Sequence, residues 1–189
     1  MRKVILSVMV TLDGFTAGPN GELDWIDVGD DALDSHLADL LRGIDGMFFG
    51  RVAYEMLAQH WPGAEVSSRS IEAEQARLMN TIPKIVLSRS QPDLNWGPAW
   101  RIGDDLAEAV SRLKEEPGKD LALFAGATAI SAFLERDLID EYRLIVFPVV
   151  LGDGQPLFKA PQPRRSLRLV ETTRFDESGV VILRYQPIS

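Results

Sequence analysis

The sequence predicts an α/β sandwich with a mostly parallel central sheet and an antiparallel pair of strands at one edge. Eight segments have the composition of strands, helical periodicity separates most of them, and a turn alone joins the last two. A helix between two strands makes a crossover that leaves them parallel, whereas a short turn makes them antiparallel. The predicted strands are residues 4–10, 46–49, 84–87, 100–102, 121–125, 142–150, 167–174 and 180–185.

The N-terminal part of the chain predicts one strand followed by one helix. Arg2 and Lys3 before an apolar run resemble the start of a signal peptide, but Asp13 and Gly14 end the run without a small-residue cleavage pattern. We therefore interpret the run as the first strand. Residues 31–41 then place leucines at helical spacing and aspartates elsewhere, which is typical of an amphipathic helix.

The middle of the chain predicts three helices, over residues 51–59, 70–80 and 105–114. The second stops before Pro83, because the residue before a proline avoids the helical conformation. In the third, Asp105 and Glu108 have the spacing of a capping box. Residues 60–69 have no pattern that determines their structure.

The next segment predicts a strand, a turn and a helix that together suit a nucleotide. Residues 121–125 are an apolar run of the kind found in buried parallel strands, and Gly126, Ala127 and Thr128 follow where a helix begins. The unpaired N–H groups of a helix N-terminus bind phosphate. Residues 142–150 are long and apolar enough to return through the centre of the sheet.

Composition indicates one domain over residues 1–189, with 46% hydrophobic residues. The net charge of -8 argues against a nucleic-acid or anionic-membrane partner. No segment approaches the roughly 20 apolar residues of a membrane span. The absence of cysteine excludes disulfides and thiolate sites and is compatible with a cytoplasmic location. Neither His36 nor His60 has the partner spacing of a zinc site, so we expect no metal.

Three turns at predicted strand ends carry residues that suit phosphate. Gly50 and Arg51 follow one strand, Ser88 and Arg89 follow the next, and the turn at Gly126 follows a third. A guanidinium and backbone N–H groups can share a phosphate, and ligands of open α/β sheets collect at the carboxyl ends of strands. The turns therefore predict one dinucleotide site. The glycine patterns of Rossmann and P-loop proteins do not occur, which disfavours those classes.

Short motifs in a fixed order cover nearly the whole chain. They are LDGFTA at residues 12–17, GELDW at 21–25, FGR at 49–51 with Tyr54 and Glu55, VLSR at 86–89, LIDE at 138–141 and PVVLGDG at 148–154. Together they resemble the dihydrofolate reductase-like superfamily. The resemblance is strongest to stand-alone relatives of the RibD C-terminal domain, the reductase part of bifunctional riboflavin-biosynthesis deaminase-reductases.

The resemblance implies a three-layer sandwich with an eight-stranded sheet, and an NADPH-dependent reductase that transfers hydride to a small heterocycle. That substrate would be pterin-like or like a pyrimidine of riboflavin biosynthesis. The implied cofactor-binding residues are Gly50, Arg51, Leu87, Ser88, Arg89, Gly126, Ala127, Thr128, Val150, Leu151 and Gly152. The implied substrate-binding residues are Asp13, Trp25, Tyr54, Phe147 and Phe158. A homodimer is also implied, and relatives often have a second glycine where Ala127 stands.

A proton must accompany the hydride, and folate-reducing relatives use a carboxylate on the first helix. The acids in that region are Asp30, Asp31 and Asp34. We choose Asp34 as the catalytic residue because it borders the apolar stripe of the helix; Asp13 is an alternative, although Asp-Gly after a strand is first of all turn chemistry. Two other interpretations are a ligand-binding protein that keeps the fold without turnover, and a structural dimer module.

Overall fold

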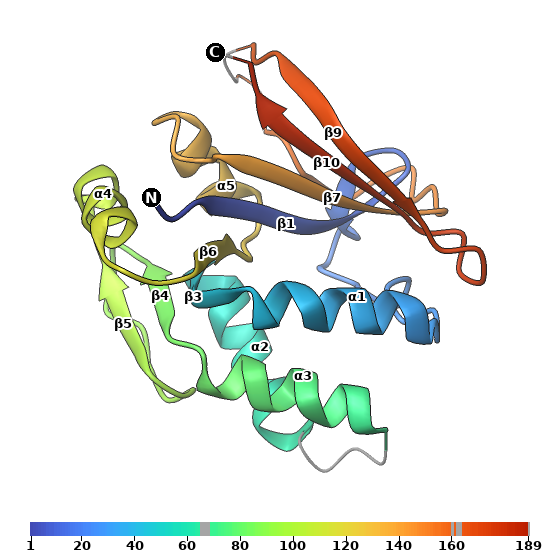
Figure 1. Cartoon of the computed structure of the whole chain (residues 1–189), viewed down its shortest axis with the longest axis horizontal. Helices are drawn as coiled ribbons and strands as arrows, with labels where there is room; N and C mark the ends of the chain where they lie inside the picture. The colour runs from blue at the N-terminus through green and yellow to red at the C-terminus, as the bar shows by residue number, and fades with distance from the viewer. Residues whose placement is uncertain (65–68, 160, 162–163, 189) are drawn as a thin grey trace.

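The computed structural model describes residues 1–64, 69–159, 161 and 164–188, and eight of its strands form one large mixed sheet between helices (Figure 1). The helices are α1 (Asp31–Arg42), α2 (Arg51–Ala64), α3 (Ser70–Thr81), α4 (Leu106–Glu115) and α5 (Ala127–Leu134). The strands are β1 (Val4–Thr11), β2 (Phe15–Ala17), β3 (Ile44–Gly50), β4 (Lys84–Leu87), β5 (Ala99–Ile102), β6 (Asp120–Leu123), β7 (Glu141–Phe147), β8 (Gln155–Pro156), β9 (Leu167–Arg174) and β10 (Val181–Pro187).

The order of strands in the large sheet is β5-β4-β3-β6-β1-β7-β10-β9. Every neighbouring pair from β5 to β7 is parallel, whereas β10 is antiparallel to both β7 and β9. The β9–β10 turn contains Gly179 with φ of 73°, a backbone conformation that favours glycine. These pairings confirm the predicted mostly parallel sheet with an antiparallel C-terminal hairpin.

The sheet separates two layers of helices (Figure 1). On one face α4 and α5 pack through Val110 and Phe133, and on the other α1, α2 and α3 pack through Leu41, Tyr54 and Met79. Strand β1 contributes alternate residues from Val4 to Val10 to the first cluster and Ile5 to the second, because successive side chains of a strand point to opposite faces. Its position at the centre of the sheet agrees with this mostly apolar sequence, which Ser7 interrupts.

Several element boundaries differ from those expected. Helix α2 continues to Ala64 and includes Pro62, well past residue 59. The capping-box prediction is wrong, because Asp105 at the start of α4 makes no capping hydrogen bond through its side chain. The small antiparallel pair of β2 and β8 was not predicted at all. None of the helices in the described ranges has the length and apolar sequence that crossing a bilayer requires.

A carboxylate cap fixes the start of α1. Asp30 Oδ1 accepts hydrogen bonds from the N–H groups of Ala32 at 3.0 Å and Leu33 at 3.1 Å, and Oδ2 accepts one from the Ser178 hydroxyl at 2.7 Å. The Ser178 hydrogen bond and these N–H groups lower the pKa of Asp30. The cap joins α1 to the β9–β10 turn, so Asp30 has a structural role.

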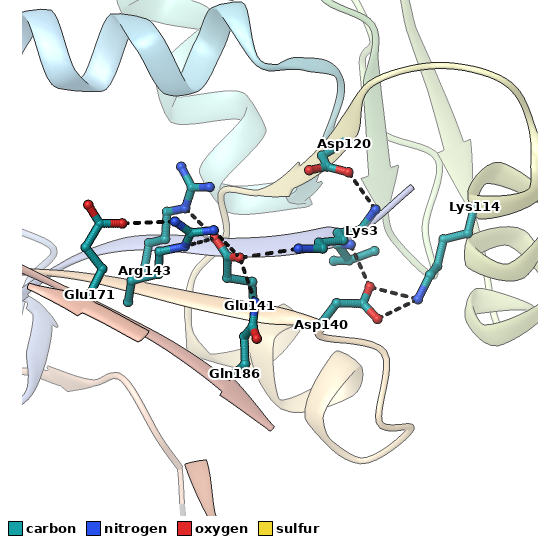
Figure 2. A network of polar contacts seen from close by, with 10 residues as sticks. Lys3, Lys114, Asp120, Asp140, Glu141, Arg143, Glu171 and Gln186 are labelled. Carbon is teal, nitrogen blue, oxygen red and sulfur yellow. Dashed lines mark hydrogen bonds and ion pairs between the residues drawn. The ribbon is translucent and has the colours of Figure 1, made fainter. Parts of the chain in front are cut away.

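A buried ionic network fixes the start of β7 (Figure 2). Glu141 is 1% exposed and accepts hydrogen bonds from Arg143 Nε and Arg184 Nε, each at 2.8 Å. Its neighbour Asp140 pairs with Lys114 Nζ at 2.7 Å. These contacts join β7 to β10 on one side and to α4 on the other.

Candidate active site at the carboxyl edge of the sheet

The structure brings the three predicted turns to one edge of the sheet. Strands β4, β3 and β6 are adjacent and parallel, so the residues that follow them leave the sheet together. Gly50 is directly opposite Leu87, the half-buried last residue of β4, and Phe48 is opposite Leu123. The predicted convergence of these turns therefore has a structural basis.

The N-terminus of α5, at this edge, has no side-chain cap and has open space beside it. Gly126 precedes the helix without a capping side chain, and a Cβ built on Gly126 would meet no atom within 4 Å. The first N–H groups of the helix therefore keep free hydrogen-bonding capacity. A Cβ on Gly50 would lie 3.2 Å from the Ala129 Cβ, so glycine allows β3 and α5 to approach closely.

Residues next to the α5 terminus differ in accessibility. Thr128 is exposed, and its Oγ1 accepts a hydrogen bond from Lys159 Nζ at 3.0 Å. Ala127 is 5% exposed, so its methyl group packs inward and leaves the helix end open. Lysine at the positive end of a helix dipole is unfavourable unless an anion offsets both charges. Lys159 was not predicted, because only the fold brings it to Thr128.

The cations of the first two turns have different surroundings. Arg51 is half-exposed and pairs with Glu55 at 2.8 Å across one turn of α2. The Arg89 side chain is 94% exposed, and Asp104 is 3.7 Å away. Ser88 is 8% exposed and donates its hydroxyl hydrogen bond to the Ser90 carbonyl at 2.9 Å. Arg89 is thus the accessible cation of its turn, while the Ser88 hydroxyl is used within the turn.

Asp13 joins the loops that follow β1 and β7. Its carboxylate accepts hydrogen bonds from the Thr11 hydroxyl at 2.6 Å and from the N–H groups of Leu151 at 3.2 Å and Gly152 at 2.8 Å. The Thr11 hydroxyl and the Gly152 N–H lower the pKa of Asp13. The carboxylate form is therefore favoured, which suits a loop clamp better than a proton donor. Val150, beside this clamp, is 67% exposed.

The predicted substrate-binding aromatic residues fall into two groups. Tyr54 and Phe147 have no exposed surface, and the Tyr54 hydroxyl is bonded to the backbone of Trp96. Trp25 is 9% exposed and lies edge-on to Phe147 with ring centroids 5.2 Å apart. In this structure these three rings form core. Phe158 is 47% exposed and is the aromatic residue of the set with surface available for a ligand.

Asp34 lies in the first turn of α1, facing α3. Its Oδ2 is 3.0 Å from Arg69 Nη2, and its side chain is 26% exposed. Burial raises the pKa of Asp34, and the charge of Arg69 opposes that shift. Asp31 pairs with the same arginine but is 83% exposed. Since α1 leads into the start of β3, its first turn lies toward the carboxyl edge.

The parallel sheet, with three turns at its carboxyl edge, defines an α/β sandwich with a candidate nucleotide site. Residues 2–181 match the RibD C-terminal domain family, so the chain belongs to this family. It is 40% identical over 184 residues to the uncharacterized protein YyaP of Bacillus subtilis (strain 168), covering 97% of this chain and 94% of that protein.

Solved structures share this fold. A putative riboflavin biosynthesis protein from Shewanella sp. PV-4 has a TM-score of 0.80 at 23% identity, covering 99% of both chains. Dihydrofolate reductase from Enterococcus faecalis, complexed with NADP(H) and RAB-propyl, has a TM-score of 0.64 at 12% identity, covering 99% of this chain and 97% of that chain. The dihydrofolate reductase-like fold is therefore confirmed.

Proposed function

We propose that this protein is an NADPH-dependent reductase of a small conjugated heterocycle, either pterin-like or pyrimidine-like. The observation that carries the proposal is the open N-terminus of α5 at Gly126, beside the glycine-ended β3. This arrangement suits a pyrophosphate, because backbone N–H groups and the helix dipole both favour an anion there. The family membership and the NADP(H) complex of the E. faecalis reductase support the same cofactor.

In this proposal the cofactor would supply the hydride chemistry. The protein would bind the cofactor, orient it against the substrate and exclude water from the site. The α5 terminus and Thr128 hold the pyrophosphate, with Arg51 close to the same edge. Arg89 contacts the adenosine 2'-phosphate. Val150 to Gly152, held by Asp13, line the nicotinamide side, and Phe158 offers an exposed ring on which a planar substrate can stack.

Asp34 is the proposed source of the proton. A general acid must be protonated before it can donate, and burial raises the pKa of Asp34 toward that state. Arg69 holds the carboxyl group in place from the start of α3. Neither Asp30, which caps α1, nor Asp13, which clamps two loops, is as available for this role.

Arg89→Ala is expected to weaken NADPH binding about tenfold and NADH binding less than twofold, since one exposed guanidinium–phosphate contact is lost. Titration of both cofactors by calorimetry measures the effect. Arg174→Ala is a matched control, because Arg174 is 74% exposed and also pairs with an aspartate, but lies on β9. Wild-type protein that binds neither cofactor would refute the proposed function. Equal losses for both cofactors would instead remove Arg89 from phosphate recognition.

Asp34→Asn is expected to lower turnover of a reducible pterin or pyrimidine about a hundredfold while leaving NADPH affinity unchanged. The wild-type rate is expected to fall as pH rises through the pKa of Asp34, and the variant is expected to lack this dependence. Oxidation of NADPH across a pH series measures both effects. Asp31→Asn removes an exposed partner of the same Arg69 and should retain turnover. If both variants lose turnover equally, the role of Asp34 is to position Arg69.

A further inference from the structure

A hollow lies on the other side of α1 from Asp34. It runs between α1 and strands β7, β10 and β9, and its outer part has a volume of about 90 Å³. We call it the hairpin groove. The residues that matter for its chemistry are Ser7, His36, Arg143, Glu171, Ile182 and Arg184. His36 is two positions after Asp34, which rotates it about 200° around the helix, so the groove and the proposed active site use opposite sides of α1.

Arg143 gives the groove a fixed pair of unused donors. Figure 2 shows its contact with the buried Glu141, to which its Nε donates a hydrogen bond of 2.8 Å; the Arg143 side chain is 22% exposed. Within the residues that the structure describes, Arg143 Nη1 and Nη2 have no hydrogen-bond or ion-pair partner. Glu141 therefore orients the guanidinium before any ligand arrives, and the remaining fork matches the two oxygens of a carboxylate.

Ser7 adds a second hydrogen-bond donor at the floor of the groove. It is 6% exposed and is directly opposite Arg143 in the β1–β7 register. Its side chain lines the hollow, and within the residues that the structure describes its hydroxyl has no hydrogen-bond partner in the protein. The hydroxyl can therefore donate to a ligand in the groove without breaking a hydrogen bond to the protein. Ser7 and Arg143 together form a polar contact point that a ligand can complete.

The charge of the lining favours a monoanion. Arg184 donates to both Glu141, at 2.8 Å, and Glu171, at 2.9 Å, so its charge is offset within the groove. The Glu171 carboxylate also lines the groove and would repel a dianion more strongly than a monoanion. Ile182 is 5% exposed and forms an apolar wall with neighbouring aliphatic side chains. The ligand that fits has one carboxylate and a small apolar body.

We propose that the hairpin groove binds a small organic carboxylate, held by the free fork of Arg143 and the Ser7 hydroxyl, with its apolar part against Ile182. This site does not depend on the proposed reductase activity. It is separated from the cofactor-binding turns by α1 and by the position of β7 and β10 beyond β1 in the sheet. Benzoate is a suitable probe, benzamide is its uncharged analogue of the same shape, and inorganic phosphate tests a more highly charged oxyanion.

The test is a titration of the full-length ¹⁵N-labelled protein with each probe, followed by nuclear magnetic resonance. Benzoate is expected to cause saturable shifts of the amides of Ser7, His36 and Arg143. Benzamide should bind at least about tenfold more weakly, because it lacks the charge-assisted pair. Ser7→Ala should reduce benzoate affinity about fivefold, and Arg143→Gln should reduce it at least about tenfold. Arg112→Gln, an exposed change on α4 across the sheet, should have no effect.

Ser7→Ala keeps the test decisive if Arg143→Gln fails to fold. Equal affinities for benzoate and benzamide, tighter binding of phosphate than of benzoate, or unchanged benzoate binding by Ser7→Ala would each overturn the proposal. So would groove shifts that depend on protein concentration without ligand, because a second copy would then cover the groove. NADPH at saturation should leave benzoate binding intact. Failure of NADPH binding with normal benzoate binding would refute the reductase proposal alone.

Discussion

Glu141→Gln is expected to lower the free energy of unfolding by about 3 kcal/mol, because breaking a buried ion pair leaves charge without its partner. Glu141 is 1% exposed and accepts three hydrogen bonds, of 2.8 to 3.1 Å, from Arg143 and Arg184. Lys3 Nζ is a further 3.8 Å away. Glutamine keeps the shape of the side chain but removes the charge that these cations share. Urea unfolding at neutral pH measures the loss.

The same substitution should change how the free energy of unfolding depends on pH in the acidic range. Burial raises the pKa of Glu141, but the hydrogen bonds from Arg184 and Arg143 outweigh burial, and the net shift is below the ordinary 4.5. A lowered carboxyl pKa contributes stability that is present above 4.5 and is lost as pH falls through the folded-state value. Glu141→Gln should therefore show less loss of stability than wild type over that acidic range.

Glu171→Gln is the matched control for the charge effect. Glu171 pairs with the same Arg184 at 2.9 Å, but its side chain is 55% exposed. An exposed pair contributes less than about 1 kcal/mol, so this variant should be close to wild type. Similar losses in the two variants would contradict the view that burial of Glu141 determines the cost.

The sequence predicted the architecture because apolar periodicity and strand ends are local signals. The run from Leu121 and the stripe through Phe133 are readable without knowledge of their partners, and both are buried as expected. The pairing of β2 with β8 was not readable, since strands of three and two residues leave no periodicity. The capping-box spacing of Asp105 and Glu108 failed because spacing does not fix the backbone angles at the cap.

The candidate site was predictable where the phosphate-binding residues are neighbours in the sequence. Gly50 with Arg51 and Gly126 before a helix are recognisable from neighbouring residues, and sheet order then brings them together. Contacts between distant segments were not predictable: Arg69 reaches Asp34, and Lys159 reaches Thr128, only in the folded chain. The exposure of aromatic residues was not predictable from the sequence either. Phe158 is exposed and accessible to a ligand, whereas Phe147 is buried in the core.

Lys84 is a further residue whose properties depend on burial that the sequence does not reveal. It lies in the predicted strand that forms β4, has no exposed surface, and pairs with no carboxylate of the described chain. Its Nζ donates to the Asn80 carbonyl at 3.0 Å and lies 4.5 Å from the centre of the Trp96 ring. Burial lowers the pKa of Lys84 from 10.5 to about 8.

Lys84→Met is expected to raise the free energy of unfolding at pH 7 by about 2 kcal/mol, because a buried charge without a carboxylate partner is replaced by an apolar side chain of similar length. Below pH 8 both the folded and unfolded wild-type chains hold the proton, and the folded state bears the full desolvation cost. Between pH 8 and 10.5 the folded chain loses the proton first, so wild-type stability rises by up to about 1.4 kcal/mol per pH unit.

Chemical unfolding over that range should show this rise in wild type and in the exposed control Lys119→Met, but not in Lys84→Met. If the stability of Lys84→Met rose with pH by the same amount, groups other than Lys84 would be responsible for the rise. If the variant were less stable than wild type at pH 7, the contacts of Lys84 with Asn80 and Trp96 would outweigh the cost of burying its charge.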